Sequence, residues 1–118
     1  MSCVRAVVLT VEDEPLINGV LSEILLDAGY MVISTENADE AIEVLQSRND
    51  IRVLVTDVNM PGSMDGLKLA AVVRSKWPPI KIVVTSAAHA ASQMPRDYQF
   101  VAKPYGQSMV AAVARAAQ

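Results

Sequence analysis

Length, composition and charge limit what this chain can be. Its 118 residues fit one domain, expected over 1–118, and are too few for a catalytic domain beside a regulatory one. The formal net charge is −3 without a Lys/Arg cluster, so we expect neither direct nucleic-acid binding nor an anionic membrane partner. Cys3 is the only cysteine, which excludes an internal disulfide, and the N-terminal apolar run is too short for a signal peptide. We therefore expect a cytoplasmic protein.

Five short apolar runs recur along the chain. They are rich in Val and Ile and do not alternate with polar residues, which is typical of strands covered on both faces. Their positions are 6–11, 31–34, 53–56, 80–85 and 98–102. The pattern predicts five buried strands.

Helical periods lie between these runs. Apolar residues repeat as i, i+1 and i+4 over 16–25, and Gly29 follows where a helix C-cap is expected. Asn37 and Glu40 have the spacing of a capping box. A third predicted helix ends at Trp77, because two prolines follow it. A last helix is predicted to place four apolar residues inward, namely Met109, Val110, Val113 and Ala117.

The alternation of strands and helices predicts an α/β fold with a doubly wound, five-stranded parallel sheet and helices on both faces. In such sheets ligands bind beyond the carboxyl ends of the strands. A strand order of 2-1-3-4-5 makes the first and third strands neighbours. The polar residues that follow those two strands are then expected to lie close together.

Acidic residues follow both of these strands. Glu12 and Asp13 come after the first apolar run and Asp57 after the third, while Thr85 and Lys103 end the fourth and fifth. Three neighbouring carboxylates require a cation, and Mg²⁺ prefers such oxygen ligands. An Asp carboxylate beside Mg²⁺ can attack phosphorus and form an aspartyl phosphate, which hydroxyl and ammonium groups stabilise.

Each of these residues has a simpler explanation when it is taken alone. The Glu12–Asp13 pair is compatible with a solvated first helical turn, Asp57 with a turn, and Lys103 with a surface lysine. Their joint placement at four strand ends favours a phosphate-directed site.

Four strings at these strand ends carry a family resemblance: "VEDEP", "TDVNMPGSMDG", "VVTS" and "FVAKPY". In this order they make the chain similar to the receiver domain of bacterial two-component response regulators, the family that includes the chemotaxis response regulator. The resemblance covers essentially the whole chain. It implies a flavodoxin-like fold and a role in phosphorelay signal transduction.

The resemblance implies a role for each matching residue. Asp57 is expected to accept a phosphoryl group from a histidine kinase or a phosphotransfer protein. Glu12, Asp13 and Asp57 would hold Mg²⁺ together with the backbone carbonyl of Asn59. The signal would pass to a downstream target protein or to an output domain outside this chain.

The remaining matches concern the response to phosphorylation. Thr85 and Lys103 would contact phosphoryl oxygens, and Phe100 falls at the position of the switch aromatic. The bond between Lys103 and Pro104 is where the family has a cis peptide, which an X-Pro sequence permits. Two departures accompany these matches. The loop from Pro61 to Asp65 is one residue longer than the commonest pattern, and 86–99 is shorter, so the fourth helix is expected to be short or irregular.

Two other functions remain open from the residues. One is a docking module that works without phosphorylation, which predicts unchanged partner binding after Asp57→Asn. The other is a Mg²⁺-dependent phosphatase with an aspartyl nucleophile. Hydrolases resembling the haloacid dehalogenases carry a second acid two residues after the nucleophile, where this chain has Asn59. We therefore expect a signalling module and no enzyme.

Overall fold

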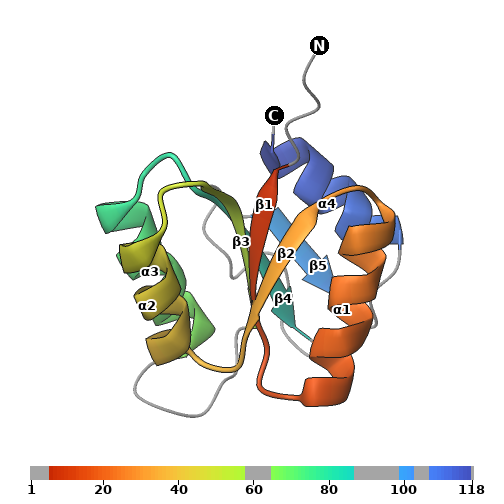
Figure 1. Cartoon of the computed structure of the whole chain (residues 1–118), viewed down its shortest axis with the longest axis horizontal. Helices are drawn as coiled ribbons and strands as arrows, with labels where there is room; N and C mark the ends of the chain where they lie inside the picture. Colours follow the sequence, from red (N-terminus) through yellow and green to blue (C-terminus); the bar gives the residue numbers. More distant parts are fainter. Residues whose placement is uncertain (1–5, 58–64, 87–98, 103–106, 118) are drawn as a thin grey trace.

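The sheet has the predicted order. The computed structural model describes residues 6–57, 65–86, 99–102 and 107–117. Within these ranges five parallel strands pair in the order β2-β1-β3-β4-β5 (Figure 1). They are β1 Val7–Val11, β2 Met31–Thr35, β3 Ile51–Asp57, β4 Lys81–Ser86 and β5 Gln99–Ala102. The first and third strands are therefore neighbours, as the site prediction required.

Helices cover both faces of the sheet (Figure 1). Alternate residues of β1 point to opposite faces, so Leu9 packs with α2 and α3, whereas Val8 packs with α1 and α4. The helices are α1 Pro15–Asp27, α2 Ala38–Ser47, α3 Gly66–Lys76 and α4 Gln107–Ala117. The doubly wound α/β prediction is confirmed. The predicted short helix between β4 and β5 falls on 87–98, outside the described residues.

Two predictions of burial were wrong at the periphery. Strand β2 lies at the edge of the sheet, and its Met31 side chain is exposed rather than covered. In α1, Leu16 and Val20 are 84% and 51% exposed, although both belong to the apolar repeat over 16–25. The stripe that faces the sheet runs through three other positions of α1, namely Asn18, Leu21 and Leu25. Polar Asn18 thus takes a core position that the apolar pattern had given to its neighbours.

The end of α1 follows the predicted C-cap. Gly29 has φ 100°, a left-handed conformation that favours glycine. The Tyr30 N–H donates to the Leu25 carbonyl at 3.1 Å, and the Gly29 N–H donates to the Leu26 carbonyl at 3.0 Å. These bonds satisfy carbonyls in the last turn and direct the chain into β2. No helix within the described ranges combines the length and apolar character needed to cross a bilayer.

The predicted N-cap of α2 is also present and is open to a direct test. The Asn37 carboxamide oxygen accepts from the Glu40 N–H at 2.9 Å, whereas the Glu40 carboxylate bonds to the Glu36 N–H instead of returning to Asn37. Replacement of Asn37 by alanine leaves the Glu40 N–H without its cap, and we expect a loss of about 1 kcal/mol in the free energy of unfolding. Urea unfolding followed by circular dichroism measures it. Asn37→Ser should retain most of the stability, and equal stability of Asn37→Ala and wild type would contradict the cap.

Candidate functional site

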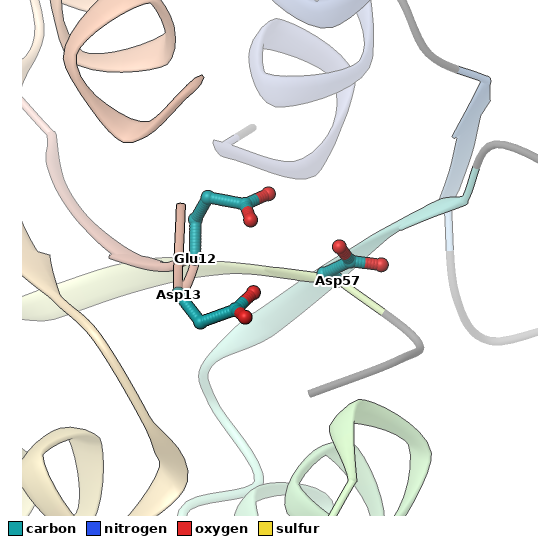
Figure 2. A group of neighbouring side chains, drawn as sticks. All are labelled: Glu12, Asp13 and Asp57. Carbon is teal, nitrogen blue, oxygen red and sulfur yellow. The ribbon is translucent and has the colours of Figure 1, made fainter. Parts of the chain in front are cut away.

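Three carboxylates meet at the carboxyl edge of the sheet. Glu12 and Asp13 directly follow β1, and Asp57 is the last residue of β3. Val11 and Thr56 are register partners, so the acidic residues begin at the same level in both strands. One carboxylate oxygen from each side chain lies within 4.8 Å of the other two (Figure 2). The predicted convergence of these side chains is confirmed.

This cluster lies mostly inside the protein. Glu12 is 1% exposed and Asp57 is 7% exposed, while Asp13 is half-buried. Like charges this close repel one another, and burial strengthens the repulsion because less water screens it. The donors are all carboxylate oxygens, which hard cations such as Mg²⁺ prefer over softer metals. The residues present therefore fit a hard divalent cation.

Thr85 lies beside Asp57 on the next strand. The two residues are register partners in the parallel pairing of β3 with β4, and Thr85 is 1% exposed. Register partners in a parallel sheet project their side chains to the same face, and neighbouring strands lie about 4.8 Å apart. The threonine predicted from the fourth strand end is thus held next to the aspartate predicted from the third.

The main chain of Glu12 is anchored by a residue that sequence reasoning missed. The Glu12 N–H donates to the Thr35 carbonyl at 3.1 Å, and the Asn18 Nδ2 donates to the Glu12 carbonyl at 3.1 Å. Asn18 is the polar residue on the buried stripe of α1. A polar residue spaced at i−3 and i−7 from Leu21 and Leu25 was the available signal. These bonds fix the point where the chain leaves the sheet and carries its first two carboxylates.

The Asp-Gly pair after the loop places α3 against Asp57. The Asp65 carboxylate caps α3 by accepting from the Lys68 N–H at 2.9 Å. Gly66 approaches Asp57 so closely that an added Cβ would lie 1.6 Å from its carbonyl oxygen and 2.6 Å from its carbonyl carbon. Only a residue without a side chain fits this contact. The helix start and the end of β3 are therefore packed backbone to backbone.

The other predicted site residues are placed only in part. Asn59, Lys103 and Pro104 lie outside the described residues. Phe100 belongs to β5 as the register partner of Val84, and the switch role of its ring stays a prediction. The lengthened loop after Asp57 also lies in an undescribed range, 58–64.

Comparisons with known proteins identify the family of this chain. Residues 8–114 match the family described as the response regulator receiver domain. The response regulator protein FleR of Pseudomonas aeruginosa is 34% identical over 88 residues, which cover 75% of this chain and 18% of that protein. The transcriptional regulator NtrC of Escherichia coli is 31% identical over 106 residues, covering 86% and 22%. The chain thus spans about a fifth of the length of these relatives.

Solved structures share the fold over nearly the whole chain. A response regulator receiver protein from Sinorhizobium medicae has a TM-score of 0.87 at 29% identity, covering 98% of this chain and 97% of its own. The response regulator TrrA of Thermotoga maritima, in complex with Mg²⁺ and BeF, has a TM-score of 0.83 at 28% identity, covering 96% and 99%. TrrA is also known in complex with the histidine kinase ThkA, with a TM-score of 0.84 at 27% identity, covering 96% and 99%. With the family match over 8–114, this chain belongs to the response regulator receiver domain family of two-component signalling.

Proposed function

We propose that this domain is a Mg²⁺-dependent phosphoacceptor in which Asp57 takes a phosphoryl group from a histidine kinase or a phosphotransfer protein. The observation that carries the proposal is the meeting of three carboxylates, one of them Asp57, with buried Thr85 on the adjoining strand. The structures of TrrA with Mg²⁺ and BeF and with a histidine kinase support this proposal, because TrrA is similar to this chain.

The metal site would use the residues at the ends of β1 and β3. Glu12, Asp13 and Asp57 would hold Mg²⁺, with the backbone carbonyl of Asn59 as a further oxygen ligand. When bound, the cation supplies positive charge that offsets the carboxylates and the phosphoryl oxygens. The hard, oxygen-only donor set of the described residues is what supports this assignment.

The transfer step is a displacement at phosphorus. A carboxylate oxygen of Asp57 forms the new O–P bond while the bond from phosphorus to the donor's leaving atom breaks, and the bonding pair leaves with the donor. Thr85 donates its hydroxyl hydrogen to one phosphoryl oxygen, and the Lys103 ammonium pairs with another. The product is an acyl phosphate on Asp57, and donor and acceptor together conserve the phosphoryl group.

Phosphorylation then changes the protein-binding surface. It adds about 1.5 to 2 negative charges and strong acceptor oxygens beside Thr85. Movement of Thr85 toward these oxygens shifts β4, and Phe100 on neighbouring β5 turns inward in response. The altered face binds a downstream target protein or an output domain. The match covers about a fifth of the length of the related regulators, which supports an output carried by other sequence.

The proposal is tested by labelling the wild-type chain with acetyl phosphate or phosphoramidate, with Mg²⁺ and with a chelator. We expect one phosphoryl group by intact mass in the presence of Mg²⁺ only, located on the peptide that contains Asp57. Absence of an adduct, together with no binding of beryllofluoride, would instead support a docking module independent of phosphorylation. Sustained turnover of a small phosphate ester would support the phosphatase.

A further inference from the structure

Asn18 forms the centre of a buried polar network behind the acidic cluster. Its side chain is 7% exposed and lies on the α1 stripe that also carries Leu21 and Leu25. Its Nδ2 donates to the Glu12 carbonyl at 3.1 Å and to the Thr35 carbonyl at 3.0 Å. Its Oδ1 accepts from the Thr10 hydroxyl at 3.0 Å. The carboxamide thus links α1 to the carboxyl ends of β1 and β2.

The chemistry of these partners determines how the amide is oriented. The two carbonyls can only accept hydrogen bonds, so both hydrogens of the amide nitrogen must face them. The Thr10 hydroxyl donates to the amide oxygen and holds the plane of the group in place. An apolar side chain would suit the surrounding stripe, yet it would leave two buried carbonyls without this donor. The amide of Asn18 therefore suits the carbonyls of Glu12 and Thr35, whereas an apolar side chain would suit the packing of α1.

The network holds Glu12 where electrostatics would push it away. Without a metal ion, the Glu12, Asp13 and Asp57 carboxylates repel one another at separations within 4.8 Å. The Glu12 main chain is held on both sides, because its N–H bonds to Thr35 and its carbonyl to Asn18. A site that is kept assembled before the cation arrives binds it more tightly, since the cation does not have to reorganise the ligands.

We propose that Asn18 is a positioning residue that sets the Mg²⁺ affinity of the acidic cluster by clamping the main chain of Glu12. This inference rests on the metal role proposed above. Residues that orient metal ligands from behind typically change metal affinity by about 10- to 100-fold when they are replaced. Asn18 acts through the backbone of a single ligand residue, so a weakening of about tenfold is expected.

The test compares Mg²⁺ titrations of the complete chain, followed by NMR or calorimetry, in matched variants. Asn18→Asp keeps the size of the side chain but turns a carboxylate toward two carbonyls, and Asn18→Leu removes the donors. Both should bind Mg²⁺ about tenfold more weakly while circular dichroism shows them folded. Thr10→Val, which loses only the hydroxyl that orients the amide, should show the same change to a smaller degree and serves if Asn18 variants fail to fold.

The control is Leu25→Val, which loosens the same stripe of α1 without touching Glu12. It should lower the thermal midpoint and leave the Mg²⁺ dissociation constant unchanged. Wild-type affinity in folded Asn18 variants, or equal weakening in Leu25→Val, overturns the positioning role. A wild-type chain that does not respond to Mg²⁺ contradicts the metal role itself. In that case, hydrogen exchange of the Glu12 N–H in metal-free protein tests whether Asn18 holds the Glu12 main chain. This exchange should be faster in the Asn18 and Thr10 variants than in wild type, and unchanged in Leu25→Val.

Discussion

Replacement of Gly66 by alanine is expected to destabilise the protein by about 3 kcal/mol, because overpacking of a well-packed interior costs up to that amount or more. The new Cβ would lie 1.6 Å from the Asp57 carbonyl oxygen, and that oxygen belongs to the backbone. No side-chain rotation can relieve such a contact. β3 is fixed between β1 and β4, so α3 must move away from the sheet. That movement pulls three buried residues of α3 out of the core, namely Leu69, Ala70 and Val73.

Gly19→Ala provides the matched control for this substitution. Gly19 lies inside α1, and a Cβ built there meets nothing within 4 Å. The same chemical change should therefore stabilise the protein by about 0.5 to 1 kcal/mol, since alanine favours a helix interior over glycine. Urea unfolding measures both variants. A Gly66→Ala protein as stable as wild type would show that α3 does not need to contact Asp57 closely.

The fold followed from local patterns, with errors where burial depends on neighbours. Uninterrupted apolar runs located the strands, and alternation with helices predicted the parallel sheet. Leu16 and Val20 were misplaced because α1 is apolar around more of its circumference than the sheet can cover. Only one face of α1 is buried, and Asn18 lies on that face because its amide has hydrogen-bond partners there. The periodicity of apolar residues does not reveal such hydrogen-bond partners.

The site was predictable to the extent that it lies at strand ends. Glu12, Asp13 and Asp57 could be brought together from the order of the strands alone, because parallel strands end at one edge. The Asn18 clamp and the close contact of Gly66 with Asp57 could not. Both depend on contacts with backbone carbonyls that form only once α1 and α3 have packed against the sheet.

Asp57→Asn is expected to abolish phosphoryl uptake and to weaken the response to Mg²⁺. The carboxamide has nearly the shape of the carboxylate, but it lacks the negative charge and therefore the nucleophilic carboxylate oxygen. With two of the three carboxylates left, repulsion in the metal-free cluster falls, and we expect a stability gain on the order of 1–2 kcal/mol without Mg²⁺. Wild type should gain about 2.7 kcal/mol at a Mg²⁺ concentration a hundred times its dissociation constant. The variant should gain much less at that concentration, as measured by thermal unfolding.

Glu14→Gln separates the loss of this particular carboxylate from the loss of one negative charge. Glu14 is exposed, lies next to the cluster in sequence, and makes no side-chain cap bond at the start of α1. It is not among the three residues whose oxygens converge. Its neutralisation should therefore preserve both the phosphoryl adduct by intact mass and the Mg²⁺-dependent stabilisation. If Asp57→Asn still took up a phosphoryl group, another residue would be the acceptor. If Glu14→Gln lost the metal response as fully, the cluster would act as a diffuse acidic surface and not as a site of three ligands.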